Sequence, residues 1–197
     1  MNKKRVAVLA VQGAFVEHEK MLESLGAECI ELRQKSDLSQ DYDALVLPGG
    51  ESTVQGKLLK ELDMFDTLKS QIEEGMPVLA TCAGLILLAE HLCNDKRTYF
   101  ATLPITVRRN AYGRQLGSFY TEGNLKGIGK VPMTFIRAPY IELVKGNVEV
   151  LGKVDGNIIA VRYHNQIALS FHPELDSDAR IHQAFLDMIS NSVERVG

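Results

Sequence analysis

The sequence predicts an α/β fold: a three-layer, open, mostly parallel sheet flanked by helices, with an antiparallel extension in the second half. In the first half, short apolar segments alternate with amphipathic ones, an order typical of parallel strands joined by right-handed helical crossovers. In the second half, strand-like segments follow one another with turn residues between them. The 197 residues suit one domain, residues 1–197, which is large enough to bury a substantial core.

The first half contains four predicted strands. The segment 5–11 is predicted as a strand buried on both faces, and the segments 29–32, 44–47 and 78–80 are the further strand candidates. Between and after them, apolar residues recur at helical spacing, which predicts helices over 17–25, 65–74 and 85–92 and a short helix after Ser52. Gly26 and Gly75 follow two of these helices as stop signals.

The second half predicts strands without intervening helices. The candidate strands are 105–107, 134–136, 148–150, 158–163 and 167–171. Turn signals at 145–147 and 155–157 separate several of them, so we expect antiparallel pairing that extends the main sheet. The chain closes with a predicted helix over 178–190, whose inward face would hold Ile181, Phe185, Met188 and Ile189.

The composition excludes several classes of protein. Apolar residues make up 45% and charged residues 24%, with a formal net charge of −3, which gives no electrostatic reason to expect nucleic acid or an anionic membrane as partner. The apolar run 6–11 is too short to span a bilayer, and it breaks at Gln12-Gly13 too early for a signal peptide. The three cysteines are an odd count without C-x-x-C spacing, so a cytoplasmic location is expected.

Cys82 is the first candidate for chemistry. It follows a short apolar strand and precedes a helix, with the small residues Ala83 and Gly84 behind it, which is the setting of a nucleophile elbow. A helix N-terminus favours the thiolate form of such a cysteine. The alternative is that Cys82 is a small buried hydrophobic residue, as most free cysteines are.

His172 and Glu174 form the second candidate, at the end of another apolar strand. In an extended chain, residues i and i+2 point to the same side, so this carboxylate can orient the imidazole and leave its other nitrogen free to act as a base. The alternative is a surface His-Pro-Glu turn. Cys82 and His172 are far apart in sequence, but the ends of two strands of one sheet would bring them together.

The segment Pro48-Gly49-Gly50-Glu51-Ser52 is the third candidate. Two glycines allow a backbone N–H to turn outward, and the N–H groups of Gly50 and Ala83 could together form an oxyanion hole. The alternative is an ordinary strand-to-helix turn. No G-x-G-x-x-G follows the first strand, so nucleotide binding has no support. The remaining histidines show no metal-ligand spacing, so solvated or structural roles are expected of them; these are His18, His91, His164 and His182.

In this order, the three segments resemble the class I, triad-type glutamine amidotransferase family. The match is closer to the glutaminase subunits of pyridoxal 5′-phosphate synthases and covers nearly the whole chain. The blocks that carry it are Val11-Gln12-Gly13-Ala14, Leu47-Pro48-Gly49-Gly50-Glu51-Ser52-Thr53, Thr81-Cys82-Ala83-Gly84-Leu85, Arg109-Asn110, Gly113-Arg114-Gln115, Phe135-Ile136-Arg137-Ala138-Pro139 and Ser170-Phe171-His172-Pro173-Glu174-Leu175.

The resemblance implies a role for each site residue. Cys82 would be the nucleophile, His172 the base and Glu174 its orienter. The other implied residues are Gly50, Glu51, Ser52, Arg109, Ile136 and Arg137, which would bind L-glutamine, and Gln12, which would act as a switch near the oxyanion loop. Arg109 would pair with the α-carboxylate of the substrate.

The resemblance also implies a reaction and a partner. The chain would hydrolyse L-glutamine to L-glutamate and ammonia, without a metal or cofactor. In a large hetero-oligomer, a synthase subunit would combine the ammonia with ribose 5-phosphate and glyceraldehyde 3-phosphate to make pyridoxal 5′-phosphate. Three alternatives are a triad glutaminase of histidine or purine biosynthesis, a scaffold domain that kept the fold, and a cysteine hydrolase acting on γ-glutamyl or peptide substrates. The Arg109 and Ile136-Arg137 blocks argue against the first.

Overall fold

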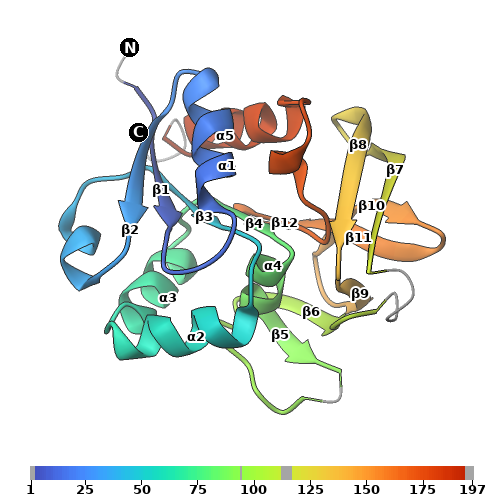
Figure 1. Ribbon diagram of the computed structural model, residues 1–197, viewed down its shortest axis with the longest axis horizontal. Coiled ribbons are helices and arrows are strands. Elements are labelled where there is room, and N and C mark those ends of the chain that lie inside the picture. Colours follow the sequence, from blue (N-terminus) through green and yellow to red (C-terminus); the bar gives the residue numbers. More distant parts are fainter. Residues whose placement is uncertain (1–2, 94, 112–116, 194–197) are drawn as a thin grey trace.

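The computed structural model describes residues 3–93, 95–111 and 117–193, with side chains as far as Ile189. Within these residues, ten strands form one sheet and two further strands form a separate hairpin (Figure 1). The path through the large sheet runs β2-β1-β3-β4-β12-β11-β9-β6-β5, and β10 pairs with β11. The predicted mostly parallel α/β sheet with an antiparallel extension is therefore confirmed.

The parallel half of the sheet is built from five short strands in the first half of the chain and near its end. Its strands are β1 (Arg5–Leu9), β2 (Glu28–Leu32), β3 (Ala44–Leu47), β4 (Val78–Thr81) and β12 (Gln166–Leu169), and each pair of neighbours is parallel. Alternate residues of a strand face opposite sides: Leu45 and Leu47 belong to one core cluster, Ala44 and Val46 to the other. The central strands β3 and β4 are buried at every position because both of their faces are covered, whereas the edge strand β2 is exposed at Glu28 and half-buried at Glu31.

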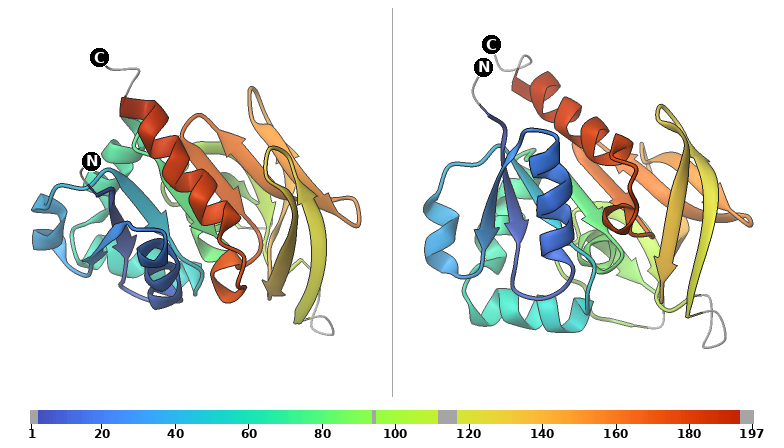
Figure 2. Two further views of the ribbon diagram at one scale, coloured as in Figure 1. Left: turned by 90° about the horizontal axis from the view of Figure 1, so that it is seen from above. Right: turned by 45° about the horizontal axis from the view of Figure 1, so that its top comes forward.

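Helices cover both faces of this sheet and complete the three layers (Figure 2). On one side lie α1 (Phe15–Ser24) and α5 (Arg180–Val193), which contribute Leu22 and Phe185 to one core cluster. On the other side lie α2 (Ser52–Glu61), α3 (Phe65–Glu73) and α4 (Ala83–Leu88), which contribute Leu59, Leu68 and Leu85 to the other cluster. No helix in the described part of the chain is long and apolar enough to cross a membrane.

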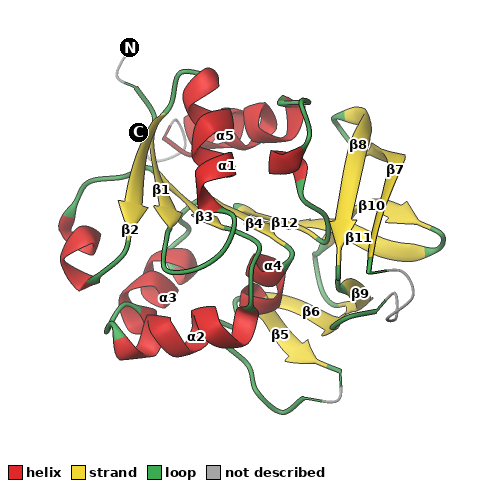
Figure 3. Ribbon diagram, viewed as in Figure 1, coloured by secondary structure: helices red, strands yellow, loops and turns green. Residues whose placement is uncertain are grey.

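The antiparallel extension continues the sheet beyond β12 (Figure 3). Its strands are β11 (Asn157–Tyr163), β9 (Tyr140–Val144), β6 (Leu103–Arg108) and β10 (Glu149–Val154), and they pair in antiparallel fashion with one another or with β12. The strand β5 (Ala89–Leu92) pairs parallel to β6 at the edge. The separate hairpin consists of β7 (Ser118–Leu125) and β8 (Gly129–Ile136).

The structure corrects two details of the sequence prediction. The expected helix over 85–92 ends at Leu88, and Ala89–Leu92 forms β5, because pairing with β6 overrides the helical spacing of a short apolar run. The expected strand over 167–171 ends at Leu169, so residues 170–172 lie beyond the ladder. The strands β7 and β9 were not predicted. Most element boundaries otherwise shift by one or a few residues, as helix and strand ends commonly do.

The strand order places four segments of interest at one edge. In the register, Leu47 pairs with Ala80 and Leu169 with Thr81, so β3, β4 and β12 end side by side. The strand β1 runs parallel to β3 and ends at the same edge. Open α/β sheets bind their ligands outside these carboxyl ends, which is where the candidate residues follow in the chain.

Candidate active site

Cys82 occupies a strained turn between β4 and α4. Its backbone has φ +48° and ψ −100°, a conformation that residues with a side chain rarely adopt, and it is 7% exposed. The helix α4 lies close against the end of β3: a side chain at Gly84 would overlap the Leu47 carbonyl group. The turn thereby lifts the thiol off the end of the strand, where its Sγ lies 3.8 Å from the Ile136 carbonyl oxygen.

His172 and Glu174 are in direct contact. The His172 Nδ1 lies 2.6 Å from Glu174 Oε1, and each residue is 6% exposed. The predicted extended i, i+2 arrangement is wrong, because Pro173–Leu175 forms a 3₁₀ turn, η3, that brings the carboxylate back to the ring. The backbone N–H of His172 donates to the Thr134 carbonyl oxygen at 2.8 Å, so the hairpin strand β8 helps to place the histidine.

Both partners of this contact favour their charged forms. Burial lowers the pKa of His172, but its contacts with Cys82 and Glu174 outweigh burial and raise the pKa to about 10. Burial raises the pKa of Glu174, but the neighbouring His18 and His172 outweigh it and hold the pKa below its usual value. The site therefore carries an imidazolium–carboxylate pair at neutral pH, with the second ring nitrogen of His172 left for Cys82.

The Gly49-Gly50 loop is clamped between the segment that follows β1 and His172. The Ala14 N–H donates to the Gly49 carbonyl oxygen at 3.0 Å, and the Glu51 N–H donates to Gln12 Oε1 at 2.8 Å. Gly50 has φ +155°, and any side chain there would overlap Gln12 Oε1. A side chain at Gly49 would overlap the His172 ring. Both glycines are thus required by close packing, and flipping the peptide between them requires breaking the bond from Ala14.

These elements enclose a pocket of about 600 Å³. The residues predicted from the sequence that line it are Gln12, Gly50, Glu51, Ser52, Cys82, Arg109, Ile136, Arg137 and His172. Glu174 and Ala83 are not in its lining: Glu174 lies behind His172, and Ala83 is the first residue of α4, whose N–H has no partner within the helix. The Gly113-Arg114-Gln115 block lies outside the described residues.

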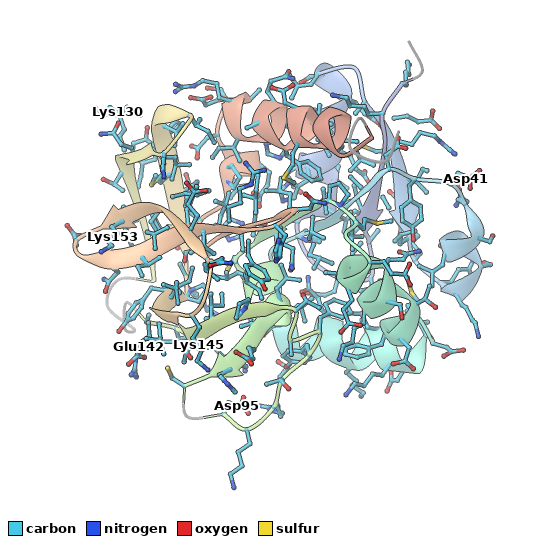
Figure 4. The ribbon with its side chains drawn as sticks, turned by 180° about the vertical axis from the view of Figure 1, so that it is seen from behind. Asp41, Asp95, Lys130, Glu142, Lys145 and Lys153 are labelled. Atoms are coloured by element: carbon cyan, nitrogen blue, oxygen red, sulfur yellow. The ribbon has the colours of Figure 1, made fainter. Side chains whose placement is uncertain are left out.

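Arg109 is oriented by two neighbours at the pocket wall. Its Nη2 donates to Ser52 Oγ at 2.7 Å, and its Nη1 lies 3.2 Å from Asp95 Oδ2. Figure 4 shows Asp95 on the loop between β5 and β6, at the margin of the molecule. Hydrogen bonds from Arg97 and the charge of Arg109 lower the pKa of Asp95 to about 2, so this carboxylate is charged beside the guanidinium.

Sequence reasoning missed several residues at the site. Ile86, Asn110 and Ser118 also line the pocket. Behind Glu174, His18 and His182 are fully buried and in contact, although structural or solvated positions were all that was expected of them. A signal was present: His18 precedes Leu22 by four residues and His182 precedes Phe185 by three, so each shares the inward face of its helix. In the part of the chain that the structure describes, no cluster of three histidine, cysteine or carboxylate side chains is arranged to hold a metal.

Comparisons with known proteins agree over nearly the whole chain. The model of the SNO glutamine amidotransferase family matches residues 8–191. The pyridoxal 5′-phosphate synthase subunit PdxT of Desulfitobacterium hafniense (strain DSM 10664 / DCB-2) is 69% identical over 186 residues, 94% of each chain. The subunit of the same name from Streptococcus pneumoniae (strain CGSP14) is 51% identical over 187 residues, 93% of this chain and 96% of the other.

Solved structures share the same fold. A crystal structure described as a glutamine amidotransferase is 40% identical, with a TM-score of 0.89 over 94% of this chain and 98% of that one. The structure of PurLQS from Thermotoga maritima has a TM-score of 0.72 over 94% of this chain and 99% of the matched chain. At 17% identity, this second likeness concerns the fold alone.

Proposed function

The chain belongs to the SNO glutamine amidotransferase family, and we propose that Cys82, His172 and Glu174 perform its hydrolysis of L-glutamine. The chain is a glutamine-hydrolysing enzyme, the glutaminase subunit of a pyridoxal 5′-phosphate synthase. One observation carries the residue assignment: the 2.6 Å contact between His172 Nδ1 and Glu174 Oε1 leaves the other ring nitrogen for a cysteine at a strained strand-to-helix turn. Residues 1–197 act as one glutaminase domain in this proposal.

The first half of the reaction forms a thioester. The raised pKa of His172 supports a starting state in which this residue is an imidazolium. In the proposed mechanism, the attacking form of Cys82 is its thiolate. The thiolate attacks the side-chain carbonyl carbon of glutamine, and backbone N–H groups of Gly50 and Ala83 stabilise the oxyanion. When the intermediate collapses, the C–N bond breaks and His172 gives its proton to the departing amine, which leaves as ammonia.

The second half regenerates the enzyme. His172, now neutral, takes a proton from water while the resulting hydroxide attacks the thioester carbonyl carbon. The thiolate leaves, glutamate is released and the imidazolium is restored. Glu174 keeps its charge throughout and stabilises each cationic state of His172. The sequence of steps needs no metal and no organic cofactor.

Glutamine binding is assigned to the pocket wall. Arg109 would pair with the α-carboxylate, because Ser52 and Asp95 already hold its guanidinium in one orientation and so reduce the entropy lost on binding. Gly50, Glu51 and Ser52 would line the substrate along the oxyanion loop, while Ile136 and Arg137 would contact it through their backbone. Gln12, whose Oε1 accepts from the Glu51 N–H, would set the conformation of that loop.

The ammonia would pass to the synthase subunit in a large hetero-oligomer in the cytoplasm. There it would be combined with ribose 5-phosphate and glyceraldehyde 3-phosphate to give pyridoxal 5′-phosphate. A glutaminase of histidine or purine biosynthesis is not favoured, because the relatives at 69% and 51% identity carry the pyridoxal 5′-phosphate synthase name.

The test is glutamate release from L-glutamine by the full chain in a confirmed complex with its cognate synthase subunit. Wild-type protein should release glutamate, and a matched Cys82→Ala complex should not. Absence of glutamate release from the wild-type complex, or retention of it by the variant, would contradict the assignment.

A further inference from the structure

A chain of buried polar side chains lies behind the carboxylate of Glu174. His18 of α1 is in contact with His182 of α5, with 2.9 Å between His18 Nδ1 and His182 Nε2. The other nitrogen of His18, Nε2, lies 3.2 Å from Thr81 Oγ1 and 3.4 Å from Glu174 Oε2. Thr81, His18 and His182 are all 0% exposed. The mechanism above uses none of these three side chains.

The surroundings keep both histidines neutral. Burial lowers the pKa of His18, and although Glu174 and Glu17 act in the opposite direction and His172 in the same one, the net pKa is lowered. Burial and His18 lower the pKa of His182 to about 3, against an opposing effect of Glu174. These are the charged and titratable groups that face the pair from α1, η3 and the end of β12. Each ring therefore has one N–H and one lone pair.

The contacts select one pair of tautomers. If His18 carries its proton on Nε2, this N–H faces both Thr81 Oγ1 and the charged Glu174 Oε2, and Nδ1 accepts from the His182 Nε2–H. His182 Nδ1 has no hydrogen-bond partner among the described residues. In this tautomer it carries a lone pair and no hydrogen, so no N–H is left unsatisfied.

The opposite pair of tautomers is unfavourable at both ends. With the proton on His18 Nδ1, the lone pair of Nε2 would face the carboxylate, and His182 Nδ1 would carry a buried N–H without an acceptor among the described residues. An unsatisfied buried donor costs on the order of 1–3 kcal/mol. A Thr81 hydroxyl that donates to Nε2 would remove neither problem.

We propose that His18 is a positioning residue for Glu174, with the His18 Nε2–H facing Oε2 of the carboxylate and His182 setting the tautomer of His18. This inference rests on the proposed function of Cys82, His172 and Glu174. Glu174 Oε1 is then hydrogen-bonded to His172, while Oε2, which has no hydrogen-bond partner among the described residues, lies 3.4 Å from His18 Nε2. The approach of His18 to Oε2 adds to the hydrogen bond at Oε1 in fixing the plane of the carboxylate, and that plane sets the direction of the His172 ring. Thr81 joins the same network one residue before the nucleophile.

The first test compares two variants of His18 with a matched control. His18→Leu removes the donor, and we expect kcat for glutamate release to fall ~10-fold with little change in KM, less than the loss expected from removing an orienter itself. The acid limb of its pH profile should move to higher pH, because a Glu174 without the donor protonates more easily. His18→Gln, whose amide nitrogen reaches about as far as Nε2, should restore most of the rate, and His91→Gln on the exposed edge strand should match the wild type.

A purely structural role for His18 predicts other results. It would lower thermal stability in both variants, leave the acid limb in place and allow no rescue by Gln, and this outcome would overturn the proposal. Should His18→Leu fail to fold, His182→Leu tests the same step because it removes the donor to His18 Nδ1. Where His18→Leu does fold, the double variant His18→Leu/His182→Leu should lose no more activity than His18→Leu alone, since His182 acts through His18. An additive loss of activity would contradict the proposal that His182 acts through His18.

A measurement without turnover completes the test. In the full-length protein, the ¹⁵N shifts of the imidazole nitrogens should show His18 and His182 as neutral Nε2–H tautomers, and His18 protonated on Nδ1 would refute the assignment. The two levels of proposal fail separately. A wild-type complex without glutaminase activity contradicts the proposed function, whereas an active wild type with an unaffected His18→Leu contradicts only the role of His18.

Discussion

Replacing Glu174 by glutamine removes the charge beside His172 and keeps the shape of the side chain. The wild-type His172 has a pKa of about 10 against an ordinary value of 6.5, and Glu174 and Cys82 together produce this rise against the effect of burial. One pKa unit corresponds to about 1.4 kcal/mol, so each unit by which the variant lowers the pKa of His172 makes the imidazolium about tenfold less stable relative to the neutral ring.

The amide also disturbs the second oxygen position. In the Glu174→Gln variant, a side chain that turns its carbonyl oxygen to His172 presents its NH₂ group to His18, which we infer to carry its proton on the facing nitrogen. Relieving this donor–donor conflict requires the unfavourable tautomers of His18 and His182. Both effects act in the same direction, and we expect kcat to fall roughly 10²–10³-fold, within the range seen for orienters of other triads and less than for Cys82→Ala.

The assay is glutamate release at saturating glutamine over a range of pH, in the complex with the synthase subunit. Glu174 is charged in the folded wild type above its depressed pKa, so the wild-type rate should fall only as the pH drops through that value. Asp187→Asn provides a matched carboxylate-to-amide control on an exposed side chain of α5, which accepts from Gln183 at 2.9 Å. Unchanged kinetics in Glu174→Gln would refute the orienter role.

The remaining predictions concern the nucleophile, the substrate clamp and the partner. Cys82→Ala should abolish glutamate release while circular dichroism and thermal unfolding remain near wild type, because a small buried side chain is exchanged for a smaller one. Arg109→Lys should raise KM for glutamine roughly tenfold with a smaller effect on kcat, since an ammonium group lacks the planar guanidinium geometry that contacts Ser52, Asp95 and a carboxylate at once. An unchanged KM would show that Arg109 does not bind the substrate. The isolated chain should be a poor glutaminase that the synthase activates. An N–H of Gly49-Gly50 that is turned away from the oxyanion position would lose about 2.7–4 kcal/mol of transition-state stabilisation, and binding of the synthase would turn it back. Equal rates of glutamate release by the chain alone and by a confirmed complex, at matched glutamine, would refute this coupling.

The parallel part of the fold could be predicted because its signals are local. The segments 44–47 and 78–80 are apolar at every position, which only a strand buried on both faces requires, and each is followed at once by small residues that turn the chain. The edge strand β5 could not be recognised in this way. Its residues Ala89 and Leu92 continue the helical spacing of Leu85 and Leu88, and only pairing with β6, which lies further along the chain, makes them a strand.

The hairpin β7–β8 shows a second limit of local patterns. The strand β7 is exposed at alternate positions and continues into Glu122, Gly123 and Asn124, which are depleted in strands, so apolar continuity does not distinguish it from a loop. Its partner β8 supplies the Thr134 carbonyl oxygen that accepts from the His172 N–H and leads into Ile136 and Arg137 at the pocket. The sequence led us to expect Ile136 and Arg137 at the pocket, but not the contact between Thr134 and His172.

The residues that would touch glutamine and those that support them differ in how the chain encodes them. Cys82 and His172 each stand in a short motif whose backbone geometry depends on neighbours within a few residues, and their meeting follows from the order of strands in an open α/β sheet. His18 and His182 are 164 residues apart and meet only because α1 and α5 pack side by side on the same face of the sheet. A histidine on an inward helical face gives no local sign of what it will contact. Its polarity at an apolar position is nevertheless informative: a fully buried imidazole must find partners, and here the partners lead to the carboxylate behind the proposed base.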